Sequence, residues 1–549
     1  MATLLPPPKR QKLNNSHPRS VQKASTTEEE RYVPQVIVQF KNAEDGALLG
    51  PAINLPADTN REALQMLVNK LRGEDEDPLP YAFHIVPKVA QPLTAGGVPQ
   101  AARLQINASI LDDALKPART GTALHQEDDL MPVVADKNLS VSGYSPEDVF
   151  EVICEPQAVF RVRSVGRCSS TLSGHAQPIL CCSLSPTGKY AATGSGDATA
   201  RLWDMEIELP KWQLTGHKGW VLCAEWEARE RVLATGGHDG HVRFWDPNGG
   251  KPIGDARRGH TKWITSLSWE PIHLNAVSPR CASASKDGTV KIWSTTRNHA
   301  EFTLAGHTAS VNVVKWGGEG LIYTGSSDRT IKIWDSKTGK LVRTLSEHAH
   351  WVNTLALNTD FVLRTGPFDH QGKKPKDDAE AAALALARYK KQIAVQPELM
   401  ISGSDDHTLF LWPSQHVKDS SDAGNAIKKP LARLTGHQKQ VNHVAFSPDG
   451  RYIASAGFDN AVKLWDGRTG KFISSLRGHV GAVYRLAWSA DSRMLVSASK
   501  DTTLKLWDLK TFKIRIDLPG HTDEVYCVDF VADKIVSGGR DKTVKIWKN

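Results

Sequence analysis

The chain lacks most features that would mark it as secreted, membrane-bound or metal-binding. Its seven cysteines are odd in number and form no C-x-x-C pair, which argues against a disulfide framework and a zinc site. No apolar run approaches the roughly 18 residues of a membrane-spanning helix, and the N-terminus has no apolar core of a signal peptide. We therefore expect an intracellular protein with reduced thiols and no membrane contact.

A phosphate-binding loop is also missing. The pattern G-x-x-x-x-G-K-[ST] occurs nowhere in the sequence, so the chain has no such loop with which to hydrolyse ATP or GTP. The chain does have length and hydrophobic content. Its 549 residues, 40% of them hydrophobic, are enough for two folded cores.

The strongest pattern is an eightfold repeat of His, Asp and Trp. Each His usually follows Gly, an Asp comes usually about twenty residues later, and a Trp stands six residues after that Asp in all eight copies. Successive His residues are mostly 41 to 43 apart, which is the period of four-stranded propeller blades. The sets are His175, Asp197, Trp203; His217, Asp239, Trp245; His260, Asp287, Trp293; His307, Asp328, Trp334; His348, Asp406, Trp412; His437, Asp459, Trp465; His479, Asp501, Trp507; and His521, Asp541, Trp547.

This repeat resembles the WD-repeat family and predicts one closed ring. Only Lys548 and Asn549 follow the last Trp, so the eighth blade lacks its outermost strand. Residues 167–172, just before the first Gly-His, can supply that strand, and the pairing would remove an open sheet edge. We expect an all-β eight-bladed WD-repeat propeller over residues 158–549, interrupted by an insertion at about 360–398.

The repeated residues have two interpretations. Ser, His and Asp could form a hydrolase triad, but a triad is needed at one site, and these residues recur in every blade. The resemblance implies a chain of hydrogen bonds that links His, Asp, Ser or Thr and the Trp indole as scaffold. We therefore predict a protein that is not an enzyme, with no catalytic residue and no cofactor of its own.

Two regions precede the ring. Residues 1–31 resemble a disordered basic tail, in which the cluster at 6–13 suggests nuclear import, although a solvated tail explains it as well. Residues 32–157 predict an α+β ubiquitin-like domain with inserted loops at 87–101 and 116–142. Its expected elements are strands at 36–40, 48–55, 81–86 and 149–154, and a helix with a Thr59 and Glu62 capping box and an apolar face of Leu64, Leu67, Val68 and Leu71.

This domain order and several phrases resemble the Notchless family, which carries the ubiquitin-like NLE domain. The phrases include residues 156–162 (PQAVFRV), 259–271 (GHTKWITSLSWEP), 315–318 (KWGG), 350–353 (HWVN) and 517–521 (DLPGH). The resemblance implies an assembly factor of the large (60S) ribosomal subunit that works in the nucleus and nucleolus. It would act as a monomer within a larger complex. The alternative is a ubiquitin-pathway or Notch-signalling adaptor scaffold.

The resemblance also implies a metal contact in trans. In this family an acidic side chain of the ubiquitin-like domain completes the Mg²⁺ coordination of the MIDAS domain of midasin, an AAA ATPase. Alignment back from residues 156–158 places that carboxylate at Glu147, with Asp148 the nearest alternative and Asp112, Asp113 and Glu127 more remote. A solvated turn residue is the competing interpretation of Glu147.

The remaining signals concern contacts of the ring. Three residues after the repeat His, three blades carry Trp220, Trp263 and Trp351, where the others carry Pro, Ser, Gln, Ala or Glu. Exposed tryptophans are common interface anchors, so we expect a protein or RNA contact there, with burial under loops as the alternative. The total charge is +8; residues 32–160 carry −9 and the tail +3, which leaves +14 for residues 161–549. A basic propeller suits a pre-60S particle, although part of this charge is the Lys or Arg that usually stands two residues before the repeat Trp and belongs to the scaffold. In the fifth copy His and Asp stand 58 residues apart, and the excess contains helix formers at 377–393. We expect this insertion to dock as an arm, with a disordered loop as the alternative.

Overall fold

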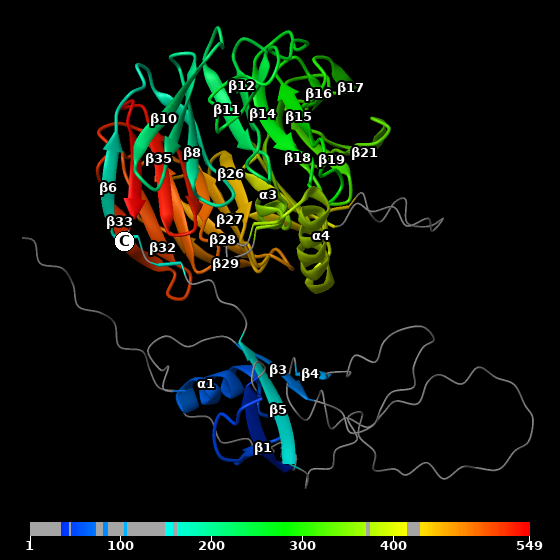
Figure 1. Ribbon diagram of the computed structural model, residues 1–549, viewed down its shortest axis with the longest axis vertical. Helices are drawn as coiled ribbons and strands as arrows, with labels where there is room; N and C mark the ends of the chain where they lie inside the picture. The colour runs from blue at the N-terminus through cyan, green and yellow to red at the C-terminus, as the bar shows by residue number, and fades with distance from the viewer. Residues whose placement is uncertain are drawn as a thin grey trace, which may run out of the picture. The chain divides into compact units, whose positions relative to one another are not determined.

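The computed structural model describes residues 34–42, 46–72, 81–85, 104–106, 149–156, 162–163, 165–368, 374–413 and 429–548. The chain divides into two compact units, Met1–Val159 and Phe160–Asn549 (Figure 1). Within the described residues, no helix is both long enough and apolar enough to cross a membrane.

The first unit has the ubiquitin-like fold that the sequence predicts. Its elements are β1 (Gln35–Asn42), β2 (Ile53–Pro56), α1 (Arg61–Arg72), β3 (Tyr81–Ile85), β4 (Leu104–Ile106) and β5 (Val149–Pro156). The sheet has the order β2-β1-β5-β3-β4, and its central strands β1 and β5 run parallel. Alternate residues of β1, Val36, Val38 and Phe40, are buried, and Leu64 and Val68 of α1 belong to the same core.

Two details of this domain differ from expectation. The helix is capped by Asn60, whose Oδ1 accepts from the Ala63 N–H at 2.9 Å, while the Thr59 hydroxyl donates to the Pro56 carbonyl. Because α1 begins at Arg61, Asn60 and not Thr59 stands at the N-cap. The second strand is also shorter than predicted, since β2 starts at Ile53. The basic tail and the loops at 87–101 and 116–142 lie outside the described residues.

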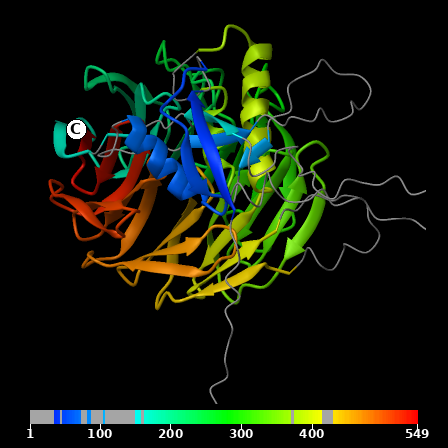
Figure 2. The ribbon, with the colours of Figure 1, turned by 90° about the horizontal axis from the view of Figure 1, so that it is seen from below.

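The described part of the second unit forms eight antiparallel sheets that follow one another around a ring (Figure 2). From the inner strand outward they are, in blade one, β7 (Ile179–Leu184), β8 (Tyr190–Ser195), β9 (Thr199–Asp204) and β10 (Leu209–Thr215); in blade two, β11 (Val221–Trp226), β12 (Leu233–Gly237) and β13 (Val242–Trp245); in blade three, β14 (Ile264–Trp269), β15 (Arg280–Ser285), β16 (Thr289–Ser294) and β17 (Ala300–Ala305); and in blade four, β18 (Val311–Trp316), β19 (Leu321–Ser326), β20 (Ile331–Asp335) and β21 (Leu341–Leu345).

Blade five contains β22 (Val352–Leu357), β23 (Met400–Ser404), β24 (Thr408–Trp412) and β25 (Ala432–Thr435); blade six, β26 (Val441–Phe446), β27 (Tyr452–Gly457), β28 (Val462–Asp466) and β29 (Phe472–Leu476); blade seven, β30 (Val483–Trp488), β31 (Met494–Ser499), β32 (Leu504–Asp508) and β33 (Lys513–Leu518); and blade eight, β34 (Val525–Val531), β35 (Lys534–Gly539), β36 (Val544–Lys548) and β6 (Arg167–Leu172). The eighth blade thus takes its outer strand from residues 167–172, as the sequence predicts. One apolar cluster joins blade eight to blade one, with Ile179 and Cys527 both buried in it, so the ring is closed.

Blade two departs from the four-stranded pattern. Its outer segment makes only isolated bridges, between Trp245 and Pro252 and between Val242 and Arg257. Pro252 has no N–H to donate, and Gly254 takes a positive φ of 70°, which lies outside the strand region, so the ladder is interrupted between the two bridges. The Arg257 guanidinium, buried here, donates instead to the carbonyls of Asp255 and Thr295.

The insertion in blade five contains two helices, α3 (Asp360–Thr365) and α4 (Asp378–Val395). Asp377 caps α4 by accepting from the Glu380 N–H at 2.7 Å. Ala381 and Ala385 of α4 pack against Ala228 and Ile272 of blades two and three. The expectation that this alanine-rich run docks as a helix is confirmed.

Candidate functional site: the ends of the ring

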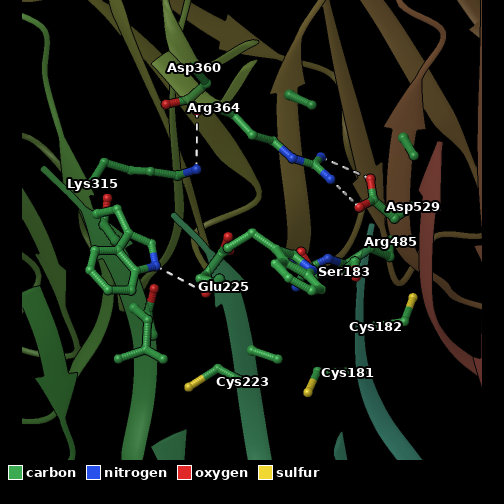
Figure 3. A pocket seen from close by; sticks show the side chains of 18 of the residues that line it. Cys181, Cys182, Ser183, Cys223, Glu225, Lys315, Asp360, Arg364, Arg485 and Asp529 are labelled. Atoms are coloured by element: carbon green, nitrogen blue, oxygen red, sulfur yellow. Dashed lines mark hydrogen bonds and ion pairs between the residues drawn. The ribbon is translucent and has the colours of Figure 1, made fainter. Parts of the chain in front are cut away.

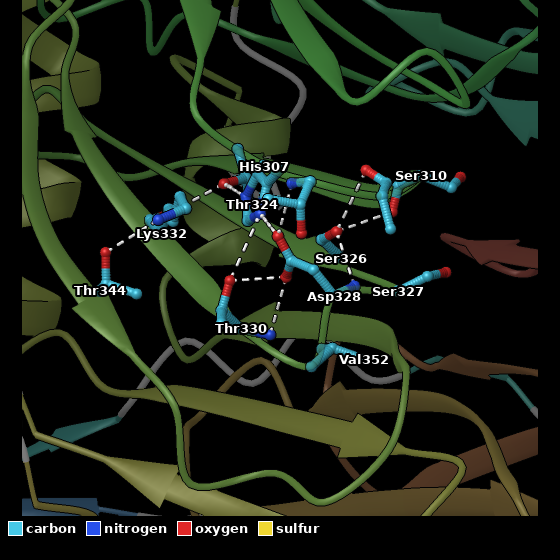
Figure 4. Close-up of polar contacts among 12 residues, drawn as sticks. His307, Ser310, Thr324, Ser326, Ser327, Asp328, Thr330, Lys332, Thr344 and Val352 are labelled. Atoms are coloured by element: carbon cyan, nitrogen blue, oxygen red, sulfur yellow. Dashed lines mark hydrogen bonds and ion pairs between the residues drawn. The ribbon is translucent and has the colours of Figure 1, made fainter.

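The repeated residues form the same polar network in each of the eight blades, shown for blade four in Figure 4. The Nδ1 of each repeat His lies 2.7–3.1 Å from its Asp carboxylate. The Nε2 lies 2.7–2.9 Å from a Ser or Thr hydroxyl on the second strand. The same hydroxyl accepts from the Trp indole N–H at 2.8–3.0 Å.

This network is scaffold because its members satisfy one another. A carboxylate can only accept, so the His donates from Nδ1 and accepts at Nε2 from the Ser or Thr hydroxyl. That residue is fully buried in every blade and its hydroxyl also accepts from the Trp indole, so it does not face a substrate. In blade one, burial alone would raise the pKa of Asp197, but hydrogen bonds from Thr199 and His175 lower it to about 2. The carboxylate is therefore ionised and fixes the turn after the second strand.

Glycine before the repeat His has a steric reason where its φ is positive. At Gly306 the φ is +158°, and a Cβ would lie 3.2 Å from the buried Trp334 ring. A side chain here would press on the same Trp whose indole is fixed by the network. The glycine at this position therefore reflects packing against the Trp of its own blade.

The three rim tryptophans stand at one end of the ring, each immediately before an inner strand. Trp220 precedes β11, Trp263 precedes β14 and Trp351 precedes β22. Trp220 is 56% exposed and Trp351 50% exposed, whereas Trp263 is partly covered by neighbouring side chains. The alternative of burial under loops therefore fails for Trp220 and Trp351. Their role as partner contacts remains a prediction.

Sequence reasoning missed a second aromatic group at this same end, in blades six to eight. Phe458 packs edge-on against Tyr484 with ring centroids 6.2 Å apart, and Tyr484 lies 5.6 Å from Tyr526. The Tyr484 hydroxyl donates to Glu524 at 3.0 Å. Phe458 precedes a repeat Asp and both tyrosines are second in their inner strands, so comparing those two positions across blades could have found them.

Inside the ring the inner strands surround a cavity of about 330 Å³ (Figure 3). It is lined by charged and polar side chains, including Glu225, His443 and Arg485. Burial raises the pKa of Glu225, although the nearby cations Lys315, Arg364 and Arg485 oppose the shift. Burial also lowers the pKa of His443 well below its usual value, so its ring is neutral.

Helix α3 closes this cavity from the end opposite to the tryptophans. Trp351 precedes β22 and α3 follows it, so the two lie at opposite ends of that strand. Arg364 of α3 donates to Asp529 of blade eight at 2.9 Å and to the Leu184 carbonyl of blade one at 2.8 Å. Lys315 of blade four lies 3.1 Å from Asp360. The insertion therefore ties blade five across the ring.

The acidic residues expected to reach a partner's metal, Glu147 and Asp148, lie outside the described residues, as do Asp112, Asp113 and Glu127. The strand β5 begins at Val149, directly after Glu147 and Asp148 in sequence, and lies at the centre of the sheet.

Within the described residues, no group of three or more His, Cys, Asp or Glu side chains could hold a metal ion. All seven cysteines are free thiols, and burial raises the pKa of Cys181 to about 12.

The fold and the repeat network define the class of protein: it is a WD-repeat propeller that follows a ubiquitin-like domain in the sequence. Family models agree with both parts. The description "NLE (NUC135) domain" matches residues 36–90, and "WD domain, G-beta repeat" matches 166–204, 209–246, 250–294 and 299–335. A model of the TEP-1 second beta-propeller matches residues 371–549. The crystal structure of the computationally designed Ika8 protein matches 70% of this chain and all of its own with a TM-score of 0.55 at 25% identity.

Known relatives extend the likeness to almost the whole chain. "Ribosome assembly protein 4" of Saccharomyces cerevisiae is 45% identical over 489 residues, covering 86% of this chain and 85% of that protein. The "Notchless protein homolog" of Arabidopsis thaliana is 45% identical and covers 78% of this chain and 80% of its own. "Protein Notchless" of Drosophila melanogaster is 40% identical and covers 77% of each chain. The chain belongs to the family of Notchless and ribosome assembly protein 4.

Proposed function

We propose that this protein is a non-enzymatic assembly factor of the large (60S) ribosomal subunit, acting in the nucleus and nucleolus. The observation that carries the proposal is the 45% identity, across both domains, to a relative named ribosome assembly protein 4. The likeness spans 86% of the chain, so it includes the propeller and the N-terminal domain together. The factor would act as a monomer inside the pre-60S particle, with the propeller as the part that docks.

The ends of the ring suit a docking scaffold. The exposed indoles of Trp220 and Trp351 provide large anchors at one end of the ring, and Trp263 occupies the equivalent position in blade three. The net charge of +14 on residues 161–549 favours contact with an RNA-rich particle, because phosphate neutralisation releases counterions. A ring whose His, Asp and Ser or Thr side chains are consumed by its own network has no evident nucleophile among the repeats.

The ubiquitin-like domain is proposed as a handle for midasin. Glu147 would supply one carboxylate oxygen to the Mg²⁺ held by the MIDAS domain of that AAA ATPase, with Asp148 as the alternative ligand. Magnesium prefers oxygen ligands in near-octahedral geometry, so a carboxylate from a partner can fill an open position. Energy would come from the partner, since this sequence has no P-loop. The domain's charge of −9 over residues 32–160 suits a metal-bearing partner.

The proposal is tested by affinity purification of the full chain and of Glu147→Ala. We expect the variant to lose midasin and to keep pre-60S particles, because the propeller is untouched. A matched control is Glu151→Ala, which removes a half-exposed carboxylate of the same domain that pairs with Lys41 at 2.7 Å. That variant should keep both partners.

The outcomes separate the competing readings. Unchanged midasin binding by Glu147→Ala, but loss with Asp148→Ala, would move the ligand by one residue. Retention of midasin by both would exclude this segment as the handle. Association of the wild type with proteasomes, a ubiquitin ligase or receptor tails, and none with ribosomal precursors, would favour the adaptor-scaffold alternative.

A further inference from the structure

At the end of the ring that carries the tryptophans, four side chains of blades two and three form a continuous row: Trp220, His238, Trp263 and Lys286. The two tryptophans precede inner strands, and His238 and Lys286 directly follow the second strands β12 and β15. The ring centroids of Trp220 and His238 are 6.0 Å apart, and those of His238 and Trp263 are 4.5 Å apart. The Lys286 Nζ lies 4.0 Å from the centre of the Trp263 ring. We call these four residues the aromatic row.

The free charge around the aromatic row is positive. Lys218 directly follows the repeat residue His217, and Lys262 stands two residues after the repeat residue His260. Both lysines are exposed, and so are Arg258 and Lys286. The two acidic residues of these turns are already engaged. The Asp239 carboxylate accepts from His217 and from the backbone N–H of Lys218. The Asp287 carboxylate accepts from His260 and from the backbone N–H of Thr261.

We propose that the aromatic row binds single-stranded RNA, with unpaired bases stacked on Trp220 and Trp263 and phosphates held by Lys218, Lys262 and Lys286. Aromatic faces interleaved with cations are the arrangement that binds single strands without sequence preference. Every base has a face to stack, and every phosphate a charge to pair. This inference deepens the proposed docking on a ribosomal particle and rests on it only for the source of the RNA.

The observations favour RNA over a protein partner for two reasons. Interfaces between proteins are depleted in lysine, yet three exposed lysines, Lys218, Lys262 and Lys286, accompany the aromatic row. The other exposed rim tryptophan, Trp351, has an acidic residue next to it, since the Asp405 N–H donates to the Trp351 carbonyl at 2.9 Å. Among the rim tryptophans that the structure describes, only those of the aromatic row combine neighbouring aromatic rings with exposed ammonium groups.

The first test is fluorescence anisotropy of the full chain with a labelled oligouridine of about 12 nucleotides, a length within the usual range of single-strand sites. Trp220→Ala with Trp263→Ala should weaken binding about 100-fold, or about tenfold for each stacked base. Trp220→Phe with Trp263→Phe should keep most of the affinity, because a phenyl ring also stacks. The control is Trp212→Ala, which removes an exposed tryptophan of the outer strand β10.

The second test is the salt dependence of the same binding. Replacing Lys218, Lys262 and Lys286 by Ala should reduce the slope of log K against log salt by about 2, or about 0.7 for each phosphate contact on a single strand. The matched control replaces Lys337, Lys340 and Lys510, three exposed lysines in turns after third strands, at the opposite end of the ring. That variant should keep the wild-type slope.

The outcomes decide the inference separately from the proposed function. Wild-type affinity in the double Trp→Ala variant, equal affinity of the wild type for a duplex of the same length, or no oligonucleotide binding at all would overturn it. The last result, with particle association lost in the same Trp→Ala variant, would assign the row to a protein contact. A wild type that binds the oligonucleotide but no ribosomal precursor would overturn the proposed function and leave the inference standing.

Discussion

Two tryptophans of blade three, Trp293 and Trp263, show what separates scaffold from surface in this molecule. Trp293 has no exposed area, and its indole N–H donates to the Ser283 hydroxyl at 2.8 Å. An equivalent Trp occupies all eight blades. Trp263 stands at the rim beside His238 and Lys286, and five blades replace it by a non-aromatic residue. A residue that recurs in every blade holds the blade together, and one that does not is free to bind.

The two ends of the ring differ in the same way. One end carries the aromatic row and the second aromatic group around Tyr484, and neither of the two described helices of the insertion lies there. The other end is crossed by α3 and α4, so its inner cavity is closed by the Arg364 contact to Asp529. The open end therefore suits partners, and the insertion serves the ring itself.

The largest effect is expected for the interior. Trp293→Ala should lower the free energy of unfolding of the propeller by about 4 kcal/mol, because it leaves a large cavity and removes the indole N–H that donates to the buried Ser283 hydroxyl. Trp351→Ala at the rim should change it by less than about 0.5 kcal/mol, because half of that side chain is already in water. Urea unfolding followed by circular dichroism measures both. Similar losses in the two variants would contradict the distinction between scaffold and surface.

The second prediction concerns the closed end. Arg364→Ala should destabilise the ring by about 3 kcal/mol, because the Asp529 carboxylate, buried beneath it, loses its counter-charge. Asp529→Ala should cost a similar amount, and the double variant should cost clearly less than the sum, since each single change leaves one unpaired charge. Additive losses in this double-mutant cycle would show that the contact does not couple blades five and eight.

The repeat could be predicted from the sequence because its information is local and redundant. Eight copies of one spacing fix the strand order, and the two residues after Trp547 are enough to predict that β6 completes the last blade. The docked helix α4 could be predicted for a similar reason, because the alanine-rich run from residue 377 is a strong helix former.

The features that escaped prediction depend on residues far apart in sequence. Helix α3 follows β22 without a sequence signal, and the partner of its Arg364 is 165 residues away in blade eight. The missing outer strand of blade two depends on a proline and on an arginine that bonds to the next blade. At the candidate site, Trp220 and Trp263 were found by comparing blades, but the position of His238 between them required the fold.

The smallest expected effect tests how the interior network depends on pH. Burial alone would raise the pKa of Asp541, but the hydrogen bond and charge of His521 and the Thr543 N–H lower it to about 2. A carboxyl group with a lower pKa in the folded state stabilises the fold fully above its unfolded pKa of about 3.8, and that contribution is lost as the pH falls through about 2. Asp541→Asn should therefore lower the free energy of unfolding by about 2 kcal/mol at pH 7 and by about half as much near pH 3.

The control for this pH experiment is Asp517→Asn, an exposed carboxylate beside Lys505, for which an effect below about 1 kcal/mol is expected. Urea unfolding at several pH values between about 2 and 7 gives the difference between wild type and each variant. A gap for Asp541→Asn that stays constant down to pH 2 would mean that the network holds its aspartate by shape alone. A gap that closes as predicted would show that charge as well as geometry stabilises the repeated interior of the ring.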